Sequence, residues 1–185
     1  MSSDGRFFNN ALTPFLAADV AAVTLAVTNK ALVPAAQMPV LGPNFFAFPG
    51  KKLRIEAFGR ITTVLTPGNF QLAVLFGTGA DANGVVLAQS AAAALTASQV
   101  NLTWRALIDI TCRSIGNTGT LFCTGHIKFN EAVIAAMQLL PASAPVVSAA
   151  CDLTSATLIP SLQALRSGGT VETMQVHELT VSELN

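Results

Sequence analysis

The feature that most constrains this chain is a pair of alternating apolar stretches joined by one short turn. In the stretch 102–114, apolar side chains occupy every second position from 102 to 112, and the same alternation returns in residues 121–129. Between them lies the sequence Gly-Asn-Thr-Gly at 116–119, a composition typical of hairpin turns. A period of two indicates a β-strand with one buried face. The pattern therefore predicts an antiparallel hairpin whose two apolar faces lie on the same side of a sheet.

A register for this hairpin follows if the turn is symmetric about its centre. Cys112 then lies opposite Cys123, and Asp109 lies opposite His126. The first pair predicts two neighbouring core thiols, with a cross-strand disulfide as the alternative. The second pair predicts a surface contact between an imidazole and a carboxylate. Because alternate residues point to opposite faces, Trp104 is expected on the buried face and His126 on the other.

Similar alternation extends over most of the chain. It marks strands at residues 52–65, 70–76, 85–88, 149–153, 157–165 and 170–179. Turn sequences such as Thr-Pro-Gly-Asn at 66–69 separate these stretches, and a short helix is possible at 131–140. About eight or nine strands with no alternating helices predict an all-β protein. The expected fold is an antiparallel, jelly-roll-like β-sandwich.

The first 49 residues differ from the rest of the chain. Prolines interrupt this region, so a long regular element is not expected there, although residues 23–28 resemble one strand. We predict an extended N-terminal arm, residues 1–49, followed by a sandwich domain, residues 50–185. Aromatic side chains are good anchors at interfaces. The candidate assembly-interface residues are therefore the Phe residues of the arm: Phe7, Phe8, Phe15, Phe45, Phe46 and Phe48.

The composition favours a protein whose surface is covered by partners. Charged residues make up 11% of the chain and hydrophobic residues 51%, and ten basic residues balance ten acidic ones. Large exposed apolar patches are rare on monomers, so we expect association with other proteins and with itself, as a homotrimer. Zero net charge argues against a nucleic-acid partner. The most apolar segment, 133–150, contains prolines and polar residues, so no membrane span is expected.

No motif in the sequence predicts catalysis or a cofactor. A nucleophile elbow of the form G-x-S-x-G is absent, and the Gly-rich segment 77–84 lacks the Lys of a phosphate-binding loop. Cys112, Cys123 and His126 lack the spacing of a metal site. Three cysteines, an odd number, predict free thiols in a cytoplasmic protein. We therefore expect no enzyme activity, no cofactor and no metal. A carbohydrate site is disfavoured because Tyr is absent and Trp104 is expected in the core.

Several short motifs resemble those of small virion structural proteins of tailed bacteriophages. They are FPGKKLRIEAFGR at 48–60, TPGNFQL at 66–72, Trp104, CRSIGNTG at 112–119, CDLT at 151–154 and QVHEL at 175–179. The Phe-rich arm lies outside this resemblance. What the resemblance implies is a jelly-roll-like capsid decoration (cement) protein that binds the head surface, with the major capsid protein or another virion protein as its partner.

Two alternatives remain open at this stage. One is a minor tail or tail-tip protein of the same particle, and the other is a host-surface (receptor or glycan) binding module. The first ten residues show no signal-peptide pattern, so the chain is expected to be made in the host cytoplasm and to reside in the virion.

Overall fold

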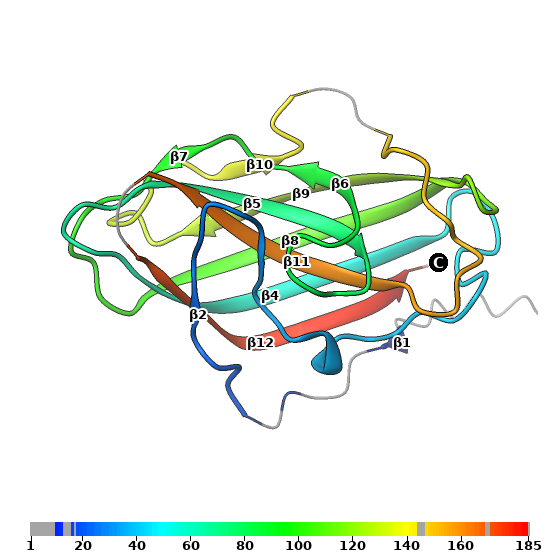
Figure 1. Cartoon of the computed structure of the whole chain (residues 1–185), viewed down its shortest axis with the longest axis horizontal. Coiled ribbons are helices and arrows are strands. Elements are labelled where there is room, and N and C mark those ends of the chain that lie inside the picture. Colours follow the sequence, from blue (N-terminus) through cyan, green and yellow to red (C-terminus); the bar gives the residue numbers. More distant parts are fainter. Residues whose placement is uncertain (1–9, 13–15, 17, 144–146, 169–170, 185) are drawn as a thin grey trace, which may run out of the picture.

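A computed structural model describes residues 10–12, 16, 18–143, 147–168 and 171–184. Within these ranges the chain forms strands β1 to β12 and one short 3-10 helix, Ala35–Gln37, and no α-helix. The strands build two antiparallel sheets that pack face to face (Figure 1). The predicted fold class is confirmed: the protein is an all-β, jelly-roll-like antiparallel sandwich.

The larger sheet has seven strands. They follow the order β1-β12-β4-β8-β9-β10, and β2 also pairs with β12. The bounds are β1 Asn10–Ala11, β2 Val23–Thr24, β4 Lys52–Thr62, β8 Leu102–Ser114, β9 Thr120–Phe129, β10 Gln138–Leu140 and β12 Thr173–Leu184. The four long strands β12, β4, β8 and β9 are neighbours, so they form one continuous surface on each side.

The smaller sheet has five strands. They follow the order β3-β11-β5-β6, and β7 also pairs with β5. The bounds are β3 Lys30–Ala31, β5 Asn69–Gly77, β6 Val85–Gln89, β7 Ala93–Ala94 and β11 Ile159–Ser167. The loop between β5 and β6 folds over the outside of β11, where the Gln163 amide donates to the Ala80 carbonyl at 2.9 Å and accepts from the Ala82 amide at 3.0 Å. This cover explains why β11 is buried on both faces.

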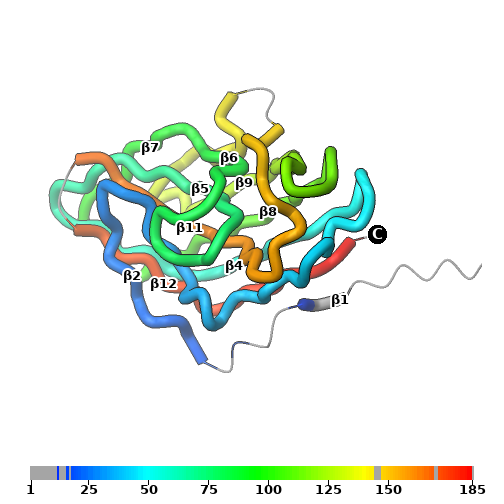
Figure 2. The backbone as a smooth tube through the Cα atoms, turned by 45° about the vertical axis from the view of Figure 1, so that its right-hand side comes forward, coloured from blue at the N-terminus to red at the C-terminus, as the bar shows by residue number. Residues whose placement is uncertain are grey.

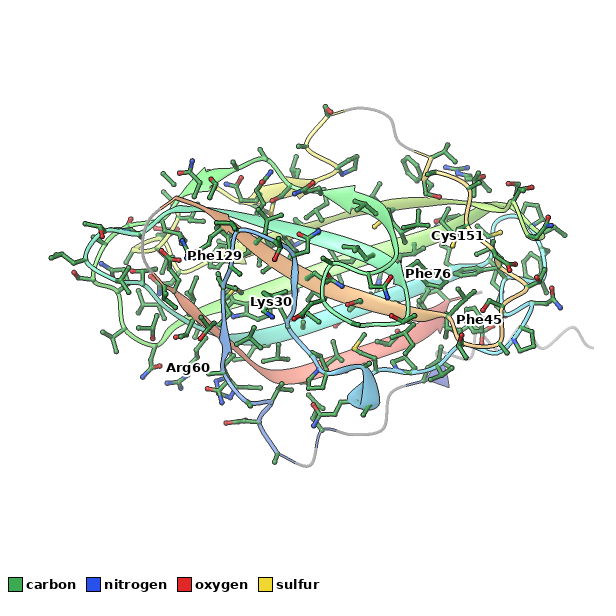
Figure 3. All side chains as sticks on the ribbon, viewed as in Figure 1. Lys30, Phe45, Arg60, Phe76, Phe129 and Cys151 are labelled. Carbon is green, nitrogen blue, oxygen red and sulfur yellow. The ribbon has the colours of Figure 1, made fainter. Side chains whose placement is uncertain are left out.

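Aromatic residues from both sheets meet in the core. Phe70 of β5 and Phe129 of β9 pack edge to face, with ring centroids 5.0 Å apart. Phe76, also of β5, packs against Phe46 with centroids 5.9 Å apart. Figure 3 shows Phe76 and Phe129 inside the sandwich, whereas Arg60 lies at its periphery. Removal of this apolar surface from water is the main favourable contribution to folding.

The described part of the predicted arm packs on its own sandwich. Val20 and Leu32 are 1% exposed, and Phe46 is 2% exposed, so all three belong to the core. Backbone amides tie the segment down, because Val20 donates to Val176 at 3.0 Å and Leu32 donates to Leu162 at 2.9 Å. Figure 2 shows the segment from β2 onward running along the sandwich. The core therefore begins well before residue 50, and the expected boundary at 49/50 is corrected for residues 18–49.

The β8–β9 hairpin forms where it was predicted, but its register differs by two residues. Cys112 pairs with Leu121, and Asp109 pairs with Thr124, so the predicted partners Cys123 and His126 are wrong. The turn spans residues 115–119, and a bulge between Cys112 and Ser114 adds a further offset. A shift of two preserves which face each side chain occupies.

Three smaller expectations also need correction. Residues 131–140 form turns and then β10, so the possible helix is absent. The expected strand at 149–153 is reduced to one isolated bridge between Cys151 and Gly119. The strand predicted for 52–65 ends at Thr62. Among the described residues, no helix has the length and apolar character needed to cross a bilayer.

Candidate functional site

One open surface of the protein is the outer face of the larger sheet. We use "outer face" for the side chains of β12, β4, β8 and β9 that point away from the smaller sheet. The strand registers arrange these side chains in rows across the four strands. One row consists of Glu178, Phe58, Arg105 and Lys128. The next row consists of Thr180, Glu56, Leu107 and His126.

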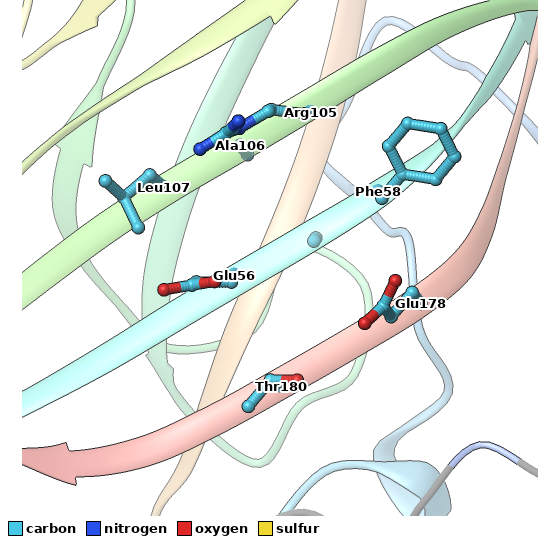
Figure 4. Close-up of a pocket in the computed structure, with 8 residues that line it drawn as sticks. Glu56, Phe58, Arg105, Ala106, Leu107, Glu178 and Thr180 are labelled. Carbon is cyan, nitrogen blue, oxygen red and sulfur yellow. The ribbon is translucent and has the colours of Figure 1, made fainter. Parts of the chain in front are cut away.

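A shallow depression lies over these two rows. Its volume is about 270 Å³, and its walls come from β12, β4 and β8 (Figure 4). The Phe58 ring is 41% exposed in the middle of the face, where an antiparallel sheet normally presents polar side chains to water. Glu56, Arg105 and Glu178 surround it and are exposed. Within the described residues, none of these three charged groups forms an ion pair.

A second depression continues the first one towards β9. It has a volume of about 430 Å³ and shares Phe58 and Arg105 with its neighbour. Lys128 and Glu131 add one positive and one negative group to its rim. The outer face is thus broad, open and of mixed charge, which suits contact with another macromolecular surface.

An ion pair stiffens the same face further along the strands. Arg54 of β4 donates two hydrogen bonds to Asp109 of β8, from Nε at 2.7 Å and from Nη2 at 2.9 Å. The carboxylate raises the pKa of the Arg54 guanidinium because it accepts these hydrogen bonds. Both side chains are about one-third exposed. Asp109 lies opposite Thr124 and binds Arg54, and His126 lies opposite Leu107, so the predicted contact between Asp109 and His126 does not form.

The other histidine has a partner that sequence patterns did not suggest. His177 Nδ1 lies 2.8 Å from Asp19 Oδ1, so the pair joins the N-terminal region to β12. His177 is the extra residue of a β-bulge between Val176 and Glu178. Asp19 and His177 are far apart in sequence, and no motif contains both of them. No group of three or more His, Cys, Asp or Glu side chains suited to a metal ion occurs in the described ranges.

The three cysteines are buried free thiols, as expected. Burial raises the pKa of the Cys123 thiol to about 12, and the nearby charge of Asp109 adds to the effect. Burial also raises the pKa of Cys112 and of Cys151. The thiolate is the reactive form of cysteine, so these side chains behave as core residues.

The six candidate Phe residues are not brought together as one site. Phe7, Phe8 and Phe15 lie outside the described residues. Phe46 is a core residue and is not available at the surface, which corrects its assignment as an interface candidate. Phe45 is partly buried, with Lys51 Nζ 4.2 Å from its ring centroid. Phe48 is 52% exposed and can contact a partner.

Four segments at one end of the sandwich carry almost no charge. Segments 25–29, 63–69, 95–101 and 171–172 meet there, and we call this region the uncharged end. Backbone hydrogen bonds connect them, for example from Ser98 to Val64 at 2.9 Å and from Leu25 to Glu172 at 2.9 Å. The exposed aliphatic residues are Val27 at 68%, Leu65 at 79%, Val100 at 67% and Val171 at 48%. Glu172 is the one charged residue of these four segments, and it is fully buried.

Comparison with known proteins adds little to this description. No protein-family model matches the chain, and no curated protein sequence matches it. Among solved structures, the metal-free form of lectin I-B4 from Griffonia simplicifolia is similar with a TM-score of 0.38 and 9% sequence identity. The similarity covers 96% of this chain and 100% of the lectin chain. A likeness at this level carries no conclusion about function.

Proposed function

We propose that this protein is a structural component of a tailed-bacteriophage virion. Its specific role is that of a capsid decoration (cement) protein, which binds the head surface and stabilises it. The uncharged end is the observation that carries the proposal, and the motif resemblance from residue 48 onward supports the choice of particle. The proposal assigns no catalytic role.

The physical reason lies in the chemistry of the uncharged end. Four exposed aliphatic side chains gather on loops that carry no exposed charge in the described residues. Covering such a surface with protein removes apolar area from water and requires no charged group to lose its hydration. Exposed apolar patches of this kind mark contact sites. We propose that the uncharged end faces the head surface and contacts the major capsid protein there.

Electron microscopy of phage heads incubated with the purified protein tests this role. We expect density of the size of one sandwich on the outer head surface, with the uncharged end directed towards the shell. Density confined to the tail of the purified virion would support the minor tail alternative. Failure to bind heads or virions would contradict both virion roles.

A pair of variants tests which end makes the contact. Leu65→Asp and Val100→Asp each place a charge on an exposed loop position, so we expect the fold to survive and the Kd for heads to rise about tenfold or more. Ile115→Asp is the matched control, because Ile115 is 51% exposed and lies in the turn at the opposite end of β8. Equal effects of all three substitutions would remove the special role of the uncharged end.

A further inference from the structure

We propose that the outer face of the larger sheet is a two-fold contact between two copies of this chain. The proposal concerns self-association and does not depend on the virion role. It rests on the order of side chains in the central row across β12, β4, β8 and β9, which is complementary to its own reverse. A two-fold contact requires this property, because each patch must meet an identical patch.

The central row shows the complementarity directly. Read across the sheet, it runs acid, aromatic, cation, cation, as Glu178, Phe58, Arg105 and Lys128. Consider a two-fold axis in the contact plane that passes between β4 and β8, nearly parallel to them. A second copy then presents the same row in reverse order. Glu178 of each copy meets Lys128 of the other, and the Phe58 ring meets the Arg105 guanidinium. Both are favourable contacts, one between opposite charges and one between a cation and a ring.

The same axis also matches a row further along the face. Arg54 and Asp109 stand on either side of the axis, so the Arg54 of one copy faces the Asp109 of the other. The Arg54–Asp109 ion pair of one copy then lies over that of the other copy in the reverse orientation. Each of the four charged groups therefore has a group of opposite sign beside it in its own copy and another across the contact. The long side chains of the face can follow the crossing of about 30° that is usual when two sheets stack.

The remaining rows contain no clash of like charges. Lys52 of β4 faces Thr111 of the second copy, and Arg60 faces Thr103. At the edge of the Lys52 row, Leu184 of one copy meets Phe122 of the other, and the Arg113 guanidinium lies 4.8 Å from the centroid of that Phe122 ring. Like charges placed together cost several kcal/mol and are the usual means by which wrong partners are rejected. In the registered rows of the described residues, this axis places no two like charges directly opposite each other.

The size of the face is sufficient for a stable contact. Strands lie about 4.8 Å apart and rise about 3.4 Å per residue, so four strands of roughly ten residues cover about 650 Å². Standard protein interfaces bury about 800 Å² on each partner, and side chains at the rim would add to the sheet area. Phe58 lies near the middle of this area. A central aromatic residue surrounded by polar groups is the usual arrangement of an interface anchor.

The mass of the purified protein provides the first test. We expect light scattering coupled to size-exclusion chromatography to show an even number of copies. If the separately predicted homotrimer also forms, the two contacts together give six copies. A monomer at all concentrations up to about 1 mM, or a trimer alone, would overturn the two-fold contact.

Charge reversal gives a sharper test. In Lys128→Glu, two carboxylates face each other at both ends of the central row, and in Glu178→Lys two ammonium groups do so. Each substitution should weaken the two-fold association roughly a hundredfold. Asp152→Lys is the matched control, since it changes the net charge as Glu178→Lys does and lies on an exposed loop outside the face. It should leave the mass unchanged.

Mixing the two charge-reversed variants tests directly whether position 178 of one copy contacts position 128 of the other. A Lys128→Glu copy and a Glu178→Lys copy complement each other across the proposed axis, so the equimolar mixture should associate although neither variant does so alone. The double variant carrying both substitutions should also associate again. Circular dichroism and thermal unfolding establish that each variant is folded. Folded variants that associate as the wild type does, or a mixture that stays dissociated, would overturn the proposal.

Discussion

At the scale of single residues, Gly59 is a position where the sandwich leaves no room for a side chain. The indole of Trp104 lies over this glycine, and its Nε1 donates to the Arg60 carbonyl at 3.1 Å. A Cβ atom at Gly59 would lie 1.9 Å from the Gln175 carbonyl oxygen and 2.8 Å from the indole. β4 therefore needs a residue without a side chain at this point, opposite the bulge of β12.

Gly59→Ala should destabilise the protein. Either β12 or the indole must move to make room, and overpacking of this kind costs about 1–3 kcal/mol. Urea unfolding followed by the fluorescence of the single tryptophan measures the change. Gly42→Ala is the control, because nothing lies within 4 Å of the Cβ position there. The control should stay within about 0.5 kcal/mol of the wild type. Equal stability of both variants would contradict this account of Gly59.

The thiols give a second prediction at this scale. Cys123 is fully buried and has its pKa raised to about 12, so almost none of it is thiolate at pH 8. Cys112 and Cys151 are also buried. We expect Ellman's reagent to modify none of the three in the native protein within minutes and all three after unfolding in guanidinium chloride. Asn117→Cys, in the exposed β8–β9 turn, provides a positive control. Rapid modification of one thiol per chain in the native wild-type protein would show that a thiol is accessible.

At the scale of elements, a buried carboxylate joins three parts of the sandwich. Glu172 immediately precedes β12 and has no exposed surface. Its Oε1 accepts the Gly68 amide of the β4–β5 turn at 2.9 Å, and its Oε2 lies 3.5 Å from Arg166 Nε of β11. Arg166 Nε also donates to the Leu25 carbonyl at 3.0 Å. Glu172 thus positions the loops that form the uncharged end.

Glu172→Leu should cost about 3–5 kcal/mol, because it removes the acceptor of the buried Gly68 amide and the buried carboxylate beside the Arg166 guanidinium. Glu172→Gln keeps an oxygen that can accept from Gly68, so its effect should be clearly smaller. Urea unfolding of the two variants, compared with the wild type, measures both changes. If the leucine variant is as stable as the glutamine variant, the carboxylate is not what holds these loops.

At the scale of the whole molecule, the N-terminal region determines where the folding unit begins. Residues 18–49 run along the sandwich and contribute buried side chains to it, among them Val20, Leu32 and Phe46. The Phe46 ring packs against Phe76 of the smaller sheet. Residues 50–185 by themselves therefore lack part of their own core.

Deletion of residues 1–49 should prevent folding. The truncated chain loses several fully buried apolar side chains, each of which costs about 2–5 kcal/mol when its core contacts are removed. The total exceeds the usual stability of a domain, which is about 5–15 kcal/mol. Deletion of residues 1–9 is the control, because it removes none of the buried residues described here. Near-ultraviolet circular dichroism and thermal unfolding distinguish the outcomes. A cooperative thermal transition in the longer deletion would show that residues 50–185 fold independently.

Much of the fold could be predicted because side-chain alternation is a local property of a strand. The period of two placed β8 at residues 102–114, and it assigned Trp104 to the core and His126 to the opposite face. The register could not be predicted in the same way. It depends on the length of the turn and on the bulge after Cys112, and neither changes the alternation.

The outer face illustrates what alternation leaves undetermined. The sequence shows that Phe58, Arg105 and Glu178 point outward from their own strands. It does not show that they share one row, because this requires β12 to lie beside β4 and β4 beside β8. Those pairings join segments far apart in the chain and are decided by how the two sheets close around one core.

The sequence by itself determined the class of the fold, the faces of the long strands and the scarcity of charge. These follow from residue types and their spacing, which act within a few residues. Tertiary structure alone decided that Phe46 is buried, that Asp109 binds Arg54, and that four segments without exposed charge meet at one end. Each of these outcomes depends on which distant segment fills a space or supplies a partner, and that choice is made only when the whole core packs.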